Sequence, residues 1–268
     1  MRGFLVLTAT NLFRRPVLSK TGGCFLLLTV CSILNGWSPV NAEETTDVLL
    51  QSARTLFSEG DFESAEETLR VALSKVENNT MRHVVCLQNL ALIEYLNFHF
   101  VEAQKLYESA LSISETSCGK ESVPVANNLY GLSRCLRRAK QNEAAGQILN
   151  RLLELRIKLL GSDHRLVGNT LFDIAVNYER EGKYDLALSY YAKALDLREK
   201  DYGKTSICLK SLLETYAVCL RKAQNDNKAS ELEARLKDLT QSSNATLPST
   251  FTGSEDGSNW QTTIYQTK

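Results

Sequence analysis

The three histidines of this chain are its first candidates for metal binding or catalysis, and their spacing supports neither role. His83, His99 and His164 are widely separated, and none has a second histidine four residues away. Zinc sites need such clustered ligands. The sequence also contains no nucleophile elbow, Walker-type phosphate loop or zinc-protease motif. We therefore expect no enzyme activity, no metal site and no cofactor.

One acidic residue beside a histidine could form part of an acid–base site. This pair, Asp163-His164, follows Gly161 and Ser162. Glycine commonly ends a helix, and serine or aspartate commonly caps the start of the next one. We therefore expect Ser162 and Asp163 to serve as helix caps rather than as catalytic groups.

A group of arginines could bind anions. Arg134, Arg137 and Arg138 lie on one short segment, although like charges at helical spacing destabilise a helix by about 0.2–0.5 kcal/mol per pair. An arginine fork holds a carboxylate through paired, charge-assisted hydrogen bonds. The segment therefore predicts contact with acidic groups of a partner, with solvated surface charges as the alternative. Because 31 basic residues balance 31 acidic ones, net charge gives no attraction to nucleic acid.

The elements that position these residues follow from an internal repeat. Similar segments are marked by alanines at 38- and then 42-residue steps, at Ala65, Ala103, Ala145, Ala187 and Ala229. Gly119, Gly161 and Gly203 keep the same 42-residue step. Self-similarity at this period is typical of a solenoid, in which each unit stacks only on its neighbours. Such a chain presents an extended binding surface.

One unit shows the local pattern most clearly, between Gly168 and Tyr202. A first helix is predicted from one apolar stripe made by Leu171, Ile174, Ala175 and Tyr178. Gly182 then breaks the pattern. A second helix is predicted with an inner side made by Ala187, Leu188, Tyr191, Ala194 and Leu195.

This pattern of small and aromatic residues resembles the tetratricopeptide repeat, over about residues 45 to 239. The 42-residue step is similar to the longer repeat of kinesin light chains. The resemblance implies an all-α, right-handed helical solenoid of about five helix pairs. The units are expected near residues 46–79, 84–119, 126–161, 168–203 and 210–239, within an array spanning 43–239.

The resemblance also implies a binding surface, because the first helix of each pair lines the concave groove of such arrays. Its groove-facing positions lie 15, 11, 8 and 7 residues before the marker alanine, and two asparagines resemble residues that hold a ligand backbone. In the C-terminal half these positions carry six basic residues against two acids. The predicted partner-binding residues are Leu92, Tyr95, Asn127, Tyr130, Arg134, Arg137, Arg138, Asn169, Phe172, Arg180, Arg221 and Lys222.

We hypothesise that the protein is an adaptor or scaffold that binds an extended peptide segment of a protein partner. Apolar side chains of this peptide would lie toward Leu92 and Tyr95, and acidic groups toward the arginines. The alternative is a structural spacer or self-assembly module that stacks through its terminal units, without a dedicated peptide ligand.

The two ends of the chain differ from the array. Residues 1–42 combine a positive leader, an apolar run from Cys24 to Leu34 and small residues up to Ala42. This layout predicts a secretory signal peptide cleaved near Ala42, and so an exported protein, periplasmic or secreted. The alternatives are a membrane anchor formed by residues 24–34, which would be the only contact with a membrane, or an organellar transit peptide. Residues 240–268 are rich in serine and threonine and predict a disordered tail.

Overall fold

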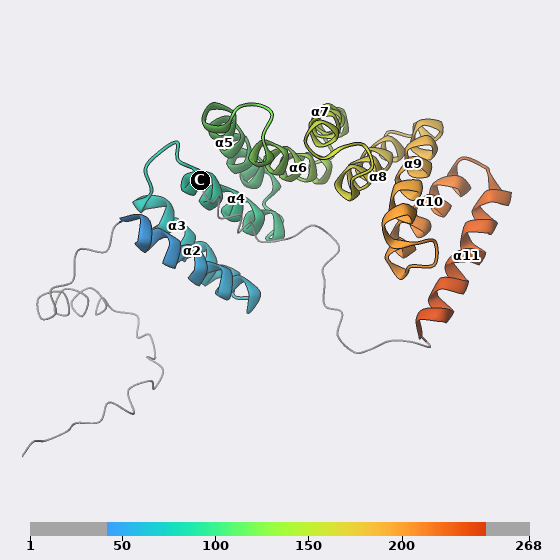
Figure 1. Ribbon diagram of the computed structural model, residues 1–268, viewed down its shortest axis with the longest axis horizontal. Coiled ribbons are helices and arrows are strands. Elements are labelled where there is room, and N and C mark those ends of the chain that lie inside the picture. Colours follow the sequence, from blue (N-terminus) through green and yellow to red (C-terminus); the bar gives the residue numbers. More distant parts are fainter. Residues whose placement is uncertain (1–41, 245–268) are drawn as a thin grey trace, which may run out of the picture. The chain divides into compact units, whose positions relative to one another are not determined.

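The computed structural model describes residues 42–244, and within this range every regular element is a helix (Figure 1). The predicted all-α helical solenoid is confirmed. The helices are α2 (Ala42–Ser58), α3 (Phe62–Lys75), α4 (Met81–Leu96), α5 (Phe100–Cys118), α6 (Val123–Arg138), α7 (Asn142–Leu160), α8 (Arg165–Arg180), α9 (Tyr184–Tyr202), α10 (Lys210–Lys222) and α11 (Asp226–Asn244), with a 3₁₀ turn, η1 (Ile207–Leu209), before α10. The predicted leader, residues 1–41, and residues 245–268 of the predicted tail lie outside the described residues.

The described helices pack mainly on their neighbours along the chain. They form five pairs, α2/α3, α4/α5, α6/α7, α8/α9 and α10/α11, and each pair also packs on the next. All five marker alanines are fully buried: Ala65, Ala103, Ala145, Ala187 and Ala229. A side chain of one methyl group allows two helix backbones to approach closely while larger neighbours fill the remaining space. The alanine repeat therefore encodes the helix pairing.

The three cysteines inside the helical pattern, Cys86, Cys135 and Cys219, are buried free thiols. Burial raises the pKa of the Cys86 and Cys135 thiols to about 12 and that of Cys219 to about 11, because an apolar environment disfavours the thiolate. These residues act as small apolar groups of the core.

The turn after α7 confirms one expected cap and corrects another. Gly161 ends α7 with φ +87° and donates its N–H to the carbonyl of Ile157 at 2.9 Å. The N-cap of α8 is His164, whose Nδ1 accepts the N–H of Leu166 at 3.1 Å. The expectation that Ser162 and Asp163 cap α8 is wrong, because α8 begins only at Arg165 and the residue directly before it occupies the cap position.

The C-terminal boundary of the array also moves. Helix α11 continues to Asn244, five residues beyond the predicted end at 239. Thr240 takes part in this helix and donates its hydroxyl to the carbonyls of Leu236 and Lys237. Among the described residues, no helix is both long and apolar enough to cross a membrane.

Replacing Gly161 by alanine is expected to lower the free energy of unfolding by about 1 kcal/mol. Its positive φ disfavours any residue with a Cβ, and a Cβ built there meets no atom within 4 Å, so the cost comes from the backbone alone. Lys140 also has a positive φ, +61°, and Lys140→Gly is the reverse change at this second position. Urea unfolding should show Gly161→Ala destabilised and Lys140→Gly at least as stable as wild type; equal stability of all three chains would contradict the argument.

Candidate functional site

The C-terminal halves of the first helices α4, α6, α8 and α10 carry most of the predicted binding residues. A cation–π contact joins α6 to α4, where the guanidinium of Arg134 lies 4.4 Å from the centre of the Tyr95 ring. Arg134 also lies 5.7 Å from the ring centre of Tyr130. Cations over aromatic rings are held by the negative face of the ring. The structure therefore brings Tyr95, Tyr130 and Arg134 together as the repeat predicts.

Two further arginines lie near the C-terminal end of α6. The guanidinium of Arg138 is 5.4 Å from the ring centre of Phe100. Arg180 reaches from α8 and donates from Nη1 to the backbone carbonyl of Arg137 at 2.8 Å. Burial and the positive charges of Arg137 and Arg138 lower the pKa of Arg180. We call Arg134, Arg138 and Arg180 the basic cluster; in the described part of the chain none of the three forms an ion pair with a carboxylate.

The other three predicted cations are neutralised within the chain. Three ion pairs account for them: Arg137 with Asp173 at 2.8 Å, Arg221 with Asp226 at 2.9 Å and Glu233 at 2.8 Å, and Lys222 with Glu179 at 2.7 Å. A carboxylate of the chain that is already paired with a cation neutralises it, so the cation attracts an acidic ligand less strongly. Arg137, Arg221 and Lys222 therefore already have intramolecular partners, and their role in partner binding stays a prediction.

The predicted apolar and amide positions are only partly accessible. Leu92 is 5% exposed, so its assignment as a contact residue is wrong, because α4 is buried on all sides from Cys86 to Glu94. Phe172 is half-buried and packs edge-on against Tyr191. Asn169 accepts a hydrogen bond from Arg198 at 3.1 Å. Asn127 is half-buried on α6.

Two arginines of the second helices contact these aromatic residues and were missed from the sequence. Arg156 on α7 lies 5.1 Å from the ring centre of Tyr130, and Arg198 on α9 lies 5.1 Å from that of Phe172. Arg156 is buried, and its Nη1 donates to the Leu166 carbonyl and the Thr170 hydroxyl. Arg156 and Arg198 are separated by 42 residues, the length of the repeat, and this spacing could have identified them from the sequence.

An aromatic turn lies beside the basic cluster. Tyr95, Phe98 and Phe100 form this aromatic turn between α4 and α5, with ring centres 5.5 Å (Tyr95–Phe100) and 6.1 Å (Phe98–Phe100) apart. Phe98 is 70% exposed and has φ +65°, a conformation that costs free energy for a bulky residue. Phe98 and Phe100 were not predicted as contacts, because the repeat assigns contacts only to first-helix positions and both residues follow the end of α4 at Leu96.

The turn of this unit also explains a polar residue in the core. Glu94 occupies a position where the repeat expects an apolar residue, yet it is buried. Its carboxylate contacts His99 Nδ1 at 2.8 Å and the Arg70 guanidinium at 3.5 Å. These partners satisfy a buried carboxylate that would otherwise be costly.

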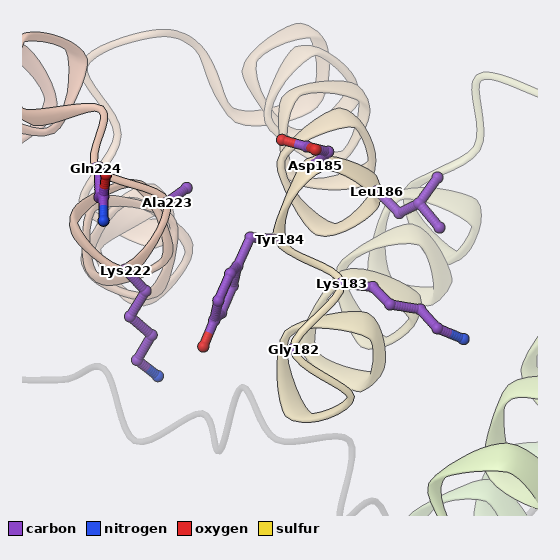
Figure 2. Close-up of a pocket in the computed structure, with 8 residues that line it drawn as sticks. All are labelled: Gly182, Lys183, Tyr184, Asp185, Leu186, Lys222, Ala223 and Gln224. Atoms are coloured by element: carbon purple, nitrogen blue, oxygen red, sulfur yellow. The ribbon is translucent and has the colours of Figure 1, made fainter.

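A hollow of about 440 Å³ lies between the turns of the last two helix pairs (Figure 2). It is lined by Gly182, Lys183, Tyr184, Asp185, Leu186, Lys222, Ala223 and Gln224. The Tyr184 ring and the Lys222 chain point into the gap, whereas the chains of Lys183 and Leu186 point away from it. Lys222 is held by Glu179, so no unpaired cation of the described residues faces this hollow from α10. Residues 42–244 also contain no cluster of ligands able to hold a metal ion.

Stacked helix pairs with a row of interacting first-helix side chains define a helical-repeat scaffold for protein–protein interaction. The family model of the tetratricopeptide repeat matches residues 83–158, 125–200 and 166–242. The chain therefore belongs to the tetratricopeptide repeat family. The helices α2 and α3 precede the matched residues and pack on the array in the same way.

Curated relatives share part of this array. The chain is 26% identical over 153 residues to a clustered mitochondria protein homolog of Meyerozyma guilliermondii, and 27% identical over 120 residues to that of Candida albicans. These matches cover 54% and 45% of this chain but only 12% and 9% of the relatives.

Solved structures resemble the fold more completely. A putative kinesin light chain of Podosopora anserina with nearly identical repeats has a TM-score of 0.65 and 16% identity, covering 75% of this chain and 97% of its own. BtubC (BKLC) from P. vanneervenii has a TM-score of 0.69 and 20% identity, covering 85% of this chain and 91% of its own. At this identity the likeness establishes the fold.

Proposed function

We propose that this scaffold binds an extended, acidic segment of a protein partner along α4, α6 and α8. One observation carries the proposal: the basic cluster has three arginines close together and no carboxylate of the described residues paired with them. The pKa of Arg180 is lowered first by burial and then by the positive charges of Arg137 and Arg138, so this arginine is subject to like-charge repulsion. Carboxylates of a ligand would relieve that repulsion and form charge-assisted hydrogen bonds.

The neighbouring aromatic turn supplies the apolar part of the proposed surface. Phe98 exposes most of its ring next to Phe100, which already holds Arg138. An extended peptide can alternate acidic and apolar side chains, because successive residues point to opposite sides of the chain. We therefore place its apolar groups at Phe98 and its acidic groups at the basic cluster.

Changing Arg138 and Arg180 together to glutamine is expected to weaken partner binding at least tenfold. Both side chains are exposed, so the fold should persist, and each lost charged hydrogen bond is worth about 1.5–3 kcal/mol. The partner would first be identified by cross-linking, and the dissociation constant of its acidic segment then measured by fluorescence anisotropy. Higher salt should weaken binding to the wild type more than to the variant.

The matched control is Lys120→Gln/Lys237→Gln, which removes the same charge from two exposed lysines, one in the loop between α5 and α6 and one on α11. This control should bind as wild type does. Equal dissociation constants for both double variants would reject the acidic-segment proposal. Sedimentation showing salt-insensitive self-association instead would favour the end-to-end assembly module.

We further propose, from residues 1–42 alone, that the chain is exported and cleaved after Ala42. N-terminal sequencing of the protein from the secreted or periplasmic fraction is expected to begin at Glu43. Recovery of residues 24–34 with the membrane fraction would instead indicate an anchor.

A further inference from the structure

We infer that the basic cluster selects a phosphorylated side chain of the partner over a carboxylate. This inference rests on the proposed function and adds the chemical class of the group bound. It is carried by two guanidiniums of the cluster that are held in place and by the way in which nearby acids are already engaged.

Arg138 and Arg180 are held by contacts that leave part of each guanidinium free. Arg180 is anchored through Nη1 to the carbonyl of Arg137, directly next to Arg138 in the chain. Arg138 is held over the Phe100 ring. The guanidinium is planar and carries five N–H donors, so one anchoring contact leaves donors available. Arginines already held in this way lose little side-chain entropy when an anion binds.

The acids nearest to this cluster on α8 are each engaged elsewhere. Asp173 binds Arg137. Glu179 accepts from both Lys222 and the Tyr191 hydroxyl. Glu181, which caps the end of α8, binds Lys183 and Asn177. The excess positive charge of the cluster therefore has no ion-pair partner among these acids, and an anionic ligand can provide one.

The excess positive charge of the basic cluster favours a ligand group with two negative charges. A carboxylate carries one charge and pairs in a fork-to-fork manner with a single guanidinium. A phosphorylated side chain carries about −1.5 to −2 charges and three strong acceptor oxygens, enough for two guanidiniums at once. Recognition of phosphorylated segments by clustered arginines is a recurring mode of peptide binding.

The surroundings favour a phosphorylated protein segment over a nucleic acid. Single-stranded nucleic acids are bound by open aromatic faces within a broad basic field. Here Tyr95 and Phe100 are contacted by the guanidiniums of Arg134 and Arg138, so Phe98 is the one ring of the aromatic turn that is mostly exposed. The 31 basic and 31 acidic residues of the chain cancel, so no such field is expected.

The test uses three fluorescein-labelled peptides that share one sequence of leucine, alanine and glutamate and differ at one central position. That position is phosphoserine, glutamate or serine. The phosphoserine peptide is expected to bind the full chain at least tenfold more tightly than the glutamate peptide, with the serine peptide weakest. Arg138→Gln/Arg180→Gln should remove this preference, and Lys120→Gln/Lys237→Gln should keep it.

A second measurement does not depend on the peptide sequence. In NMR spectra of the arginine Nε–H groups, phenyl phosphate should shift Arg138 and Arg180 at lower concentration than acetate does. Equal affinity for phosphoserine and glutamate would overturn the inference while leaving the acidic-segment proposal intact. Tighter binding of a single-stranded oligonucleotide than of the phosphoserine peptide would also overturn it, in favour of nucleic acid. If the wild-type chain bound neither the phosphoserine peptide nor the glutamate peptide, both proposals would be rejected.

Discussion

Tyr191→Ala is expected to lower the free energy of unfolding by about 3–5 kcal/mol, the range for removing a large buried side chain. Tyr191 on α9 is fully buried. Its ring stacks on Tyr216 with centres 5.4 Å apart and meets Phe172 edge-on at 5.8 Å. Its hydroxyl donates to Glu179 at 2.7 Å. Alanine would leave a cavity at the contact between the α8/α9 and α10/α11 pairs, measurable by urea unfolding followed by circular dichroism.

Tyr191→Phe separates the ring from the hydroxyl. It keeps the stacked ring and removes one hydrogen bond, while Glu179 keeps its ion pair with Lys222. We expect a cost of about 1 kcal/mol. If the alanine variant lost no more stability than the phenylalanine variant, the argument that ring packing holds this interface would fail.

Asp173→Asn is the second change with a large expected effect, again about 3–5 kcal/mol. The side chains of Arg137 and Asp173 are only 15% and 11% exposed, and their atoms are 2.8 Å apart. Asparagine would leave the Arg137 guanidinium in this site without a counter-charge, where burial makes an unpaired cation costly. Chemical unfolding of the variant measures the loss.

The double change Arg137→Met/Asp173→Leu is the companion variant. It removes both charges and keeps apolar volume, so it is expected to be more stable than Asp173→Asn. Together with the single changes Arg137→Met and Asp173→Leu, the double change closes a cycle that gives the coupling free energy of the pair. Stability of Asp173→Asn within about 0.5 kcal/mol of wild type, the range of ordinary surface substitutions, would show that the pair carries little weight.

The fold could be predicted because its determinants are local and repeated. The marker alanines, such as Ala187, occur at one position in each unit, and close helix packing requires a small residue there. The same register placed Arg137 and Arg180 on consecutive first helices, and the Arg180 guanidinium donates to the Arg137 carbonyl there. Period and residue size were sufficient for this part of the structure.

The neutralised cations could not be predicted in the same way. Arg137 pairs with Asp173, and Lys222 pairs with Glu179, each between neighbouring helix pairs. Such partners depend on side-chain reach between units, which spacing along the chain does not give. The exposure of Leu92 was also predicted wrongly. Residues of α4 are buried on every side, so its sequence has no polar face that shows which apolar residues point outward.

The backbone conformation of the aromatic turn could not be predicted from the sequence either. The residue two positions before the second helix of each described pair has a positive φ, at Gly60, Phe98, Lys140, Gly182 and Gln224. Five positions with one backbone conformation carry four residue types, because the two helix ends impose the turn. Glycine at two of these positions indicated the conformation, but phenylalanine at another did not.

Packing between successive helix pairs has a mechanical consequence. Each pair meets chiefly the pair before and the pair after it, so a pulling force passes through every interface in turn and the individual extensions add. The array then stretches like springs joined in series. A partner lying across α4, α6 and α8 would bridge two of these joints and stiffen them, while the joint between α9 and α10 would keep its compliance.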